Sequence, residues 1–229
     1  MGFSFFGILR ILMSLVRFLL IGFLSLSILA VVFYNFKNPE TTRYMTSEKY
    51  RLGKIKYEWV DIGEIEPVMI RSVIAAEDAN FCLHWGFDLQ AIRLVWRNGG
   101  SGGASTLTQQ VVKNLFLWHG RNWFRKGLEA VATPIVELIW TKRRILEIYL
   151  NIAEFDEGVF GIQAAARHYY GANSKSLSSK QAAALAAVLP DPKFRSAINP
   201  SSQLMKRASS IRDGAETIRK DRHDRCVVF

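Results

Sequence analysis

A run of uncharged, mostly apolar residues near the N-terminus constrains this chain more than any other feature. Residues 18–36 are nineteen positions without a charge, bracketed by Arg17 and Lys37. As a helix this run is roughly 28 Å long at ~1.5 Å per residue, close to the ~30 Å hydrocarbon core of a bilayer. A buried core helix or a cleaved signal peptide gives a similar pattern, but no Ala-x-Ala cleavage site follows. We therefore predict a cytoplasmic tail and one transmembrane helix within residues 1–37.

The balance of charge indicates an anionic partner. The net charge is +10, from 30 Lys and Arg against 20 Asp and Glu. Phosphates, anionic lipid and nucleic acid all suit such a charge. Basic residues lie on both sides of the apolar run, so the positive-inside rule does not fix its orientation. The expectation is a short N-terminal tail inside and a large domain outside.

After the apolar run, the sequence changes from mixed polar residues to apolar residues at helical spacing. Residues 38–67 are predicted to be a juxtamembrane linker with one short strand near 54–60. Residues 68–200 form the predicted main domain, with helices expected at 68–78, 89–98, 107–117, 122–150, 159–170 and 179–189. Thr141 and Lys142 can divide the longest of these, and Pro134 can kink or break it. Residues 201–229 are predicted to be a basic C-terminal tail, periodic only near 211–218. The pattern is typical of a mainly α-helical protein.

The two cysteines, Cys82 and Cys226, are far apart in the chain. Their spacing indicates neither a disulfide framework nor a zinc site. We expect Cys82 to be a small buried hydrophobic residue.

Two acidic motifs lie on either side of a polar stretch. Glu77 and Asp78 end an apolar run, and Glu129 follows the cations Arg125 and Lys126. Burial makes a carboxylate a better base, whereas neighbouring cations keep one ionised. Two carboxylates in such different environments can divide acid and base work, as chemistry at a sugar–oxygen bond requires. The spacing alone leaves ordinary surface carboxylates as an alternative.

The polar stretch between the motifs carries side chains that can bind a ligand. These lie on neighbouring faces of the helix predicted over 107–117 and are Thr106, Gln109, Gln110, Lys113 and Asn114. N–H groups at the start of that helix attract anions. No Lys-Ser or Lys-Thr pair follows the glycines, so the stretch is not a nucleotide P-loop. In the first motif, Phe81 and His84 are open to a packing and structural role or to contact with a sugar.

Taken together, these residues resemble the peptidoglycan glycosyltransferase family (glycosyltransferase family 51), in particular its monofunctional, membrane-anchored branch. The resemblance covers about residues 68–200 and rests on five segments in order: EDANFCLHWGFD (77–88), GASTLTQQ (103–110), RKGLE (125–129), KRRILEIYLN (142–151) and GVFGIQAAA (158–166). Ala104 stands where many relatives have a second glycine. Larger relatives add a penicillin-binding transpeptidase domain, and no Ser-x-x-Lys occurs in this chain. We therefore expect glycan polymerisation without cross-linking.

The resemblance implies a lysozyme-like α-helical domain and an inverting glycosyl transfer. The implied substrates are lipid II, a disaccharide-pentapeptide on undecaprenyl pyrophosphate, and the growing glycan strand as donor. Glu77 would be the base that takes the proton of the 4-hydroxyl, and Glu129 would help organise the leaving pyrophosphate. Arg125, Lys126 and Lys113 would neutralise that pyrophosphate. A divalent cation, Mg²⁺ or Mn²⁺, could join them, with no metal ligand assigned and no organic cofactor expected. Seven further residues match positions that line the family's cleft: Asp78, Phe81, His84, Thr106, Gln109, Gln110 and Asn114.

The resemblance also implies a single-pass protein of the bacterial inner membrane with its domain on the periplasmic side. Other cell-wall synthesis proteins are candidate partners. A nucleic-acid binder would explain the charge but neither the acidic motifs nor the apolar run. The rival enzyme is a lysozyme-like lytic transglycosylase, which cleaves glycan and needs no pyrophosphate site; the cations around Glu129 favour the polymerase. A scaffold with a degenerate site is disfavoured by the retained Glu77 and Glu129.

Overall fold

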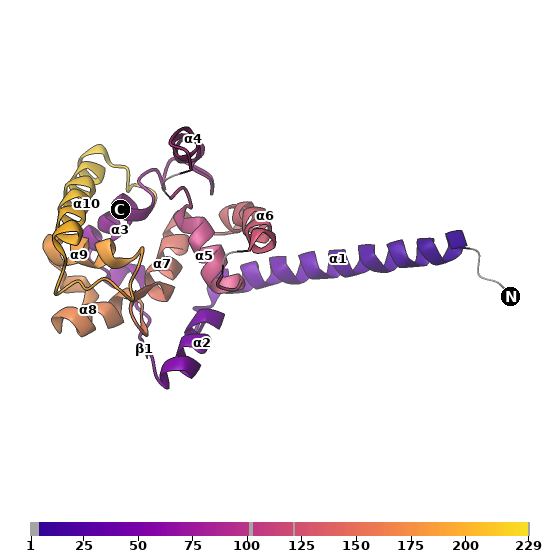
Figure 1. Ribbon diagram of the computed structural model, residues 1–229, viewed down its shortest axis with the longest axis horizontal. Helices are drawn as coiled ribbons and strands as arrows, with labels where there is room; N and C mark the ends of the chain where they lie inside the picture. The colour runs from indigo at the N-terminus through magenta and orange to yellow at the C-terminus, as the bar shows by residue number, and fades with distance from the viewer. Residues whose placement is uncertain (1–4, 101–102, 121, 229) are drawn as a thin grey trace. The chain divides into compact units, whose positions relative to one another are not determined.

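The chain forms two compact units, residues 1–38 and 39–229. This computed structural model describes residues 5–100, 103–120 and 122–228 (Figure 1). The first unit holds α1 (Phe5–Phe36), and the stretch Leu9–Phe36 is long and apolar enough to cross a membrane. Nearly all of its described side chains are exposed, which is unlike a core helix of a soluble protein. The helix begins well before residue 18, because the residues that precede Arg17 are also apolar.

The second unit is mainly α-helical, as predicted. Its α-helices and strands are α2 (Arg43–Leu52), β1 (Lys56–Tyr57), α3 (Pro67–Glu77), α4 (Leu89–Arg97), α5 (Leu107–Phe116), α6 (Trp123–Ile139), α7 (Lys142–Ile152), β2 (Glu154–Asp156), β3 (Val159–Phe160), α8 (Ile162–Tyr170), α9 (Ser179–Val188) and α10 (Ser202–Asp221). Short 3₁₀ turns lie at Ile62–Glu64 and Ser174–Ser176.

Side-chain caps fix where the helices near the acidic motifs begin. The side chain of Asp88 accepts from the backbone N–H groups of Gln90 and Ala91 at the start of α4. Thr106 caps α5 and forms a capping box with Gln109. The side chain of Thr141 caps α7 and so divides the long predicted helix in two. Pro134 lies inside α6 and does not end it.

The core of this unit consists of two helix groups. Helices α3, α9 and α10 pack against one another, and α5 packs against α6 and α7. On α5 the fully buried face carries Val111 and Val112, while Gln110, Lys113 and Asn114 are only partly buried. The amphipathic spacing of α5 therefore turns its polar side chains away from the core and toward a common surface.

The segment predicted as a linker is built into the second unit. Thr42 caps α2, and Met45 on that helix is fully buried. The strand predicted near 54–60 is β1, which pairs in parallel with β3, while β2 pairs with β3 in antiparallel fashion through a bulge. The sheet order is β1-β3-β2, so residues 56–57 are held by a strand about a hundred positions later. This long-range pairing has no local signal in the sequence.

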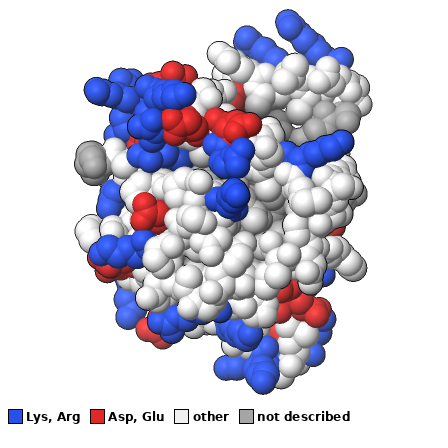
Figure 2. Space-filling model, turned by 90° about the vertical axis from the view of Figure 1, so that its left-hand side faces the viewer, with Lys and Arg blue, Asp and Glu red and all other residues white. Residues whose placement is uncertain are grey.

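The C-terminal tail is also more ordered than predicted. It forms the twenty-residue helix α10, whose buried side chains Leu204, Ile211, Ala215 and Ile218 recur at helical spacing. Charged residues crowd the other faces and obscure this stripe in the sequence. Figure 2 looks at the side of the molecule that lies at the left of Figure 1, where α8, α9 and α10 are drawn. The Lys and Arg side chains of this side form separate groups with acidic side chains among them.

The expectation of unpaired cysteines is wrong. Cys82 and Cys226 are 144 positions apart in sequence and form a disulfide with their Cα atoms 5.6 Å apart. The same C-terminal segment is held by an ion pair from Arg71 Nε to Asp224 Oδ2 at 2.6 Å. Arg143 Nη1 also donates to the Val227 carbonyl at 2.5 Å. Helix α10 brings the C-terminus back to the loop after α3, which spacing in the sequence does not reveal.

Candidate active site

Glu77 lies in the last turn of α3, where the buried apolar face of that helix carries it into the protein. Met69, Val73 and Ile74 are fully buried on that face. The Glu77 side chain is 13% exposed. Gln110 Nε2 on α5 donates to Glu77 Oε2 at 3.0 Å, and Arg207 Nη2 on α10 lies 3.7 Å from Oε1.

Burial raises the pKa of Glu77, and the nearby donor and cations only partly oppose this. The hydrogen bond from Gln110 lowers the pKa, as do the positive charges of Arg207, Lys113 and Arg195. A carboxylate with a raised pKa holds a transferred proton better than an exposed one. Glu77 therefore has the environment of a general base.

Glu129 has the opposite environment. It lies on α6 with its side chain 2% exposed, and Arg125 Nη1 contacts its Oε2 at 2.8 Å. Lys126 Nζ contacts the other carboxylate oxygen, and also donates to Ser105 Oγ at 3.2 Å. The spacings i,i+4 and i,i+3 place both cations on the same side of the helix as Glu129. Both oxygens of Glu129 therefore contact cationic side chains, and the carboxylate holds Arg125 and Lys126 in place.

Lys113 lies within electrostatic reach of both carboxylates. Burial lowers its pKa; the charges of Glu129 and Glu77 raise it, and those of Arg125 and Lys126 lower it. In the part of the chain that the structure describes, its ammonium has no hydrogen bond or ion pair. The next residue, Asn114, has a buried Oδ1 that also lacks a hydrogen-bond partner. Lys113 and Asn114 are thus an unpaired cation and an unpaired acceptor beside each other.

Two cavities adjoin these residues. The α3–α4 cavity, about 610 Å³, is lined by the end of α3 including Glu77, by α4 and by the loop 103–106. The α2–α5 cavity, about 300 Å³, is lined by Gln110, Lys113 and Asn114 on α5, by Tyr44 on α2 and by residues 189–193. Gln110 contacts Glu77 of the first cavity and lines the second. Glu77 therefore has space for a ligand on one side, and the unpaired polar groups of α5 have space on the other.

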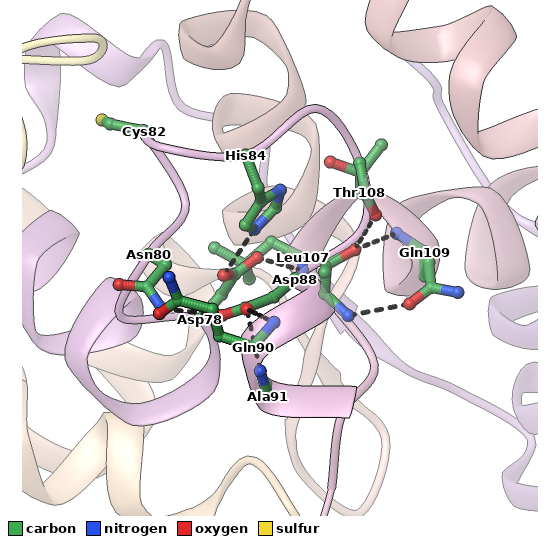
Figure 3. A network of polar contacts seen from close by, with 12 residues as sticks. Asp78, Asn80, Cys82, His84, Asp88, Gln90, Ala91, Leu107, Thr108 and Gln109 are labelled. Atoms are coloured by element: carbon green, nitrogen blue, oxygen red, sulfur yellow. Dashed lines mark hydrogen bonds and ion pairs between the residues drawn. The ribbon is translucent and has the colours of Figure 1, made fainter. Parts of the chain in front are cut away.

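Asp78 and His84 join the loop after α3 to the start of α5. His84 Nε2 and Asp78 Oδ1 are 2.8 Å apart, and Leu107 N donates to Asp78 Oδ2 at 2.9 Å (Figure 3). Thr106 Oγ1 donates to the Gly86 carbonyl at 2.7 Å. These contacts occupy both carboxylate oxygens of Asp78, the hydroxyl of Thr106 and one ring nitrogen of His84, and His84 Nδ1 has no hydrogen-bond partner. We therefore assign Asp78, His84 and Thr106 to holding the loop against the start of α5.

Gln109 and Phe81 are also supporting residues rather than open ones. The side-chain oxygen of Gln109 accepts from the Thr106 N–H at 3.1 Å within the capping box. Phe81 is fully buried, and the Lys142 ammonium lies 4.5 Å from its ring centroid. The interpretation of Phe81 as a residue facing a sugar is therefore corrected, because its ring is buried and contacts His84 and Lys142.

Reasoning from the sequence missed several residues of the site. Arg207 beside Glu77 comes from the segment predicted as a tail. Tyr149 on α7 is buried, with its hydroxyl 3.5 Å from Gln110 Oε1. Tyr44 lies in the segment predicted as a linker. The apolar spacing in α10 could have indicated a helix that carries Arg207, and the cap at Thr42 could have indicated a helix that carries Tyr44. Ser101, Gly102 and Arg121 lie outside the described residues.

A buried carboxylate with a raised pKa, together with a group of cations around a second carboxylate, suits a group transfer in which a hydroxyl attacks and an anionic group leaves. Comparison with known proteins agrees with that class. The Transglycosylase family pattern matches residues 45–216, and the chain belongs to this family. Its fold is therefore lysozyme-like, as predicted.

Similar proteins match over most of their length. A Jannaschia sp. (strain CCS1) protein named biosynthetic peptidoglycan transglycosylase is 52% identical over 215 residues, covering 93% of this chain and 90% of that protein. Proteins of the same name from Pseudomonas putida (strain KT2440) and Stutzerimonas stutzeri (strain A1501) are both 47% identical, covering 84% and 85% of this chain and 86% and 84% of their own lengths. The matched region 45–216 begins inside α2 and ends inside α10.

Proposed function

We propose that this protein is a peptidoglycan glycosyltransferase that polymerises lipid II into glycan strands and releases undecaprenyl pyrophosphate. Membership of the Transglycosylase family supports this reaction. The observation that carries it is the contrast between Glu77, a buried carboxylate with a raised pKa, and Glu129, whose two oxygens contact Arg125 and Lys126. A glycan-cleaving enzyme has no anionic leaving group and no use for that cluster.

Glu77 accepts the proton of the 4-hydroxyl of the incoming lipid II sugar. The hydroxyl oxygen then forms a bond to the anomeric carbon of the donor, as the bond from that carbon to the phosphate oxygen breaks. The electron pair of the broken bond leaves with the pyrophosphate, and attack from the opposite face inverts the anomeric configuration. A hydroxyl is a weak nucleophile, so a base within hydrogen-bonding reach contributes about 10²–10⁴-fold in rate.

The leaving pyrophosphate is stabilised by Lys113, Arg125 and Lys126. Cations fixed in place before the reaction stabilise the charge that develops on the leaving group without reorganisation. Arg125 is held by Glu129 and by its Nε donating to the Gly120 carbonyl at 3.1 Å. Of these three cations, Lys113 alone has no hydrogen bond or ion pair among the described residues, so it has the greatest capacity to bind a new anion.

The predicted divalent cation has no preformed carboxylate pocket here. Within the described ranges, no group of three or more His, Cys, Asp or Glu side chains could hold a metal ion. Both oxygens of Glu129 already contact cationic side chains. Any Mg²⁺ or Mn²⁺ in the reaction would depend on the oxygens of the substrate's phosphates for most of its ligands, and no step above depends on it.

We place the protein in the bacterial inner membrane as a single-pass protein, with α1 as its anchor and the domain on the periplasmic side. The length and apolar character of α1 support the anchor. The Cys82–Cys226 disulfide supports the orientation, because disulfides persist in oxidising compartments and are rare in the cytosol. Trp96, Trp123 and Phe124 are largely exposed and suit contact with the membrane surface, where the lipid substrate lies. Interaction with other cell-wall synthesis proteins stays a prediction.

Incubation of the purified full-length protein with labelled lipid II tests the reaction. We expect polymer that muramidase digests to disaccharide units, together with free undecaprenyl pyrophosphate. Preformed glycan strands are the control substrate, since the rival lytic enzyme would release soluble fragments from them. No polymer from lipid II across a range of detergents and divalent cations would overturn the proposal.

A further inference from the structure

Three residues that line the α2–α5 cavity lie outside the motifs. Tyr44 comes from α2, His119 from the connection between α5 and α6, and Lys193 from the loop after α9. These three elements are far apart in sequence, and all lie in the second compact unit. The chain thus places an aromatic side chain from its juxtamembrane helix beside the polar groups of the active site.

Tyr44 and His119 stack face to face. Their ring centroids are 3.8 Å apart and their planes are inclined by 21°. The edge of Phe160 contacts Tyr44 with centroids 5.6 Å apart, and the Tyr44 hydroxyl donates to Glu154 Oε2 at 2.6 Å. Tyr44 is therefore held by its contacts with Phe160 and Glu154, whereas His119 is an exposed residue that lines the cavity.

The His119 ring is uncharged at neutral pH. Burial of its inner side against Tyr44, and then the positive charges of Lys113, Arg125 and Lys193, lower its pKa to about 4. A neutral ring presents an aromatic face without adding another cation to the site. Stacking on such a face suits the C–H side of a sugar ring, which is apolar, better than a charged ring would.

Two α5 residues that line the same cavity offer groups for the polar rim of a sugar. Asn114 Oδ1 is a buried acceptor without a partner, which a hydroxyl or acetamido N–H can satisfy. Lys113 beside it can bind the attached phosphate. A volume of about 300 Å³ lies at the small end of ligand pockets and suits one sugar ring rather than a chain of them.

We propose that the Tyr44–His119 pair is a stacking platform for the sugar ring that bears the pyrophosphate, so that α2 and the α5–α6 connection help to select the donor. This inference rests on the proposed function. The platform positions and binds the sugar, while Glu77 and the cations act on the reacting atoms. It also gives the juxtamembrane helix α2 a part in the site besides connecting the domain to α1.

Replacing His119 tests the platform. We expect His119→Ala to raise the KM for lipid II about three- to tenfold with kcat little changed, because a stacked aromatic contact contributes about 0.5–1.5 kcal/mol to ground state and transition state alike. His119→Phe keeps a neutral aromatic face and should restore a KM near that of the wild type. Tyr50→Ala is the matched control, since Tyr50 is on α2, is 86% exposed and does not line the cavity.

Two further measurements distinguish loss of the platform from loss of folding or of turnover. The melting temperature of each variant checks that folding is intact, and calorimetric binding of a short-chain, water-soluble lipid II analogue measures the platform without turnover. If the wild type polymerises lipid II and His119→Ala has the same KM and the same affinity for the analogue, the platform is overturned and the proposed function stands. His119→Phe behaving like His119→Ala would overturn stacking. Failure of the wild type to polymerise lipid II would contradict the proposed function itself.

Discussion

At the scale of single residues, the candidate site contains two glutamate carboxylates in different environments. Glu77 is buried beside one amide donor and a cation 3.7 Å away, so its pKa is raised. Glu129 has Arg125 and Lys126 on its two oxygens. The first arrangement favours taking up a proton and the second favours fixed charge. The tasks of the two carboxylates therefore follow from their neighbours.

The raised pKa of Glu77 predicts the pH dependence of catalysis. As the pH falls through that pKa, the base becomes protonated and kcat/KM should fall, at a pH above that of an ordinary glutamate. Arg207→Gln removes a charge that favours the ionised form, so the acid limb of the profile should move to higher pH. Arg219→Gln, an exposed arginine on the same helix, is the control and should leave the profile in place. A limb that stays or moves to lower pH in Arg207→Gln would count against this account.

At the scale of secondary-structure elements, α5 is the part that connects the two halves of the site. Its buried face packs against α6 and α7, and its polar face carries Gln110, Lys113 and Asn114. The N-terminus of α5 is held by Thr106 and by Asp78, which accepts from the Leu107 N–H. Because Gln110 lies one turn from this anchor, displacement of the cap would displace the donor to Glu77.

Thr106→Val should therefore affect both stability and activity. Loss of the cap and of the bond to the Gly86 carbonyl should lower the free energy of unfolding by about 1–2 kcal/mol. The polymerisation rate should fall as well, measured at a temperature where the variant is folded. Ser178→Ala removes the matching capping box of α9 and should cost similar stability while leaving the rate near wild type. Equal rates in the two variants would argue against a role for the α5 cap in positioning the site.

Helix starts and ends that depend on neighbouring residues could be predicted from the sequence. Contacts between segments far apart in the sequence could not. The caps at Asp88 and Thr106 and the division at Thr141 are local, since each side chain bonds to N–H groups two or three residues on. The resemblance brought Glu77, Gln110 and Lys113 into one site for the same reason. Tyr44, Arg207 and the disulfide reach the site only through the pairing of β1 with β3 and the packing of α10, for which single positions carry no signal. Asp78 and Thr106 were found, but their bonds to the protein changed their assigned role.

At the scale of the whole molecule, the C-terminal segment of the second unit is attached to the region that carries Glu77. The disulfide joins the loop after α3 to the residues after α10, and Arg71 and Arg143 hold the same C-terminal segment. Between these points α10 contributes Arg207 to the neighbourhood of Glu77. The C-terminal residues therefore support the loop that follows the proposed base.

Breaking the disulfide should lower stability. A cross-link that spans 144 positions removes much entropy from the unfolded chain, so reduction should lower the free energy of unfolding by about 2–5 kcal/mol. The measurement is a thermal melt of the detergent-solubilised protein with and without dithiothreitol. The double variant Cys82→Ala/Cys226→Ala should melt at the lower temperature in both conditions. A wild-type melt that reductant does not change, after thiol titration confirms reduction, would contradict the prediction.

The most direct test of the account is the polymerisation rate of Glu77→Gln on lipid II at neutral pH. Glutamine can still accept the hydrogen bond from Gln110 but cannot take up a proton, so the rate should fall at least about 100-fold. Because burial raises the pKa of Glu77, the ionised group costs stability at pH values above its folded pKa, and the variant should melt at the same temperature as the wild type or higher. Glu216→Gln, at an exposed side chain of α10, is the control and should keep the wild-type rate. A folded Glu77→Gln protein that polymerises lipid II within about threefold of the wild-type rate would contradict the assignment of Glu77 as the base.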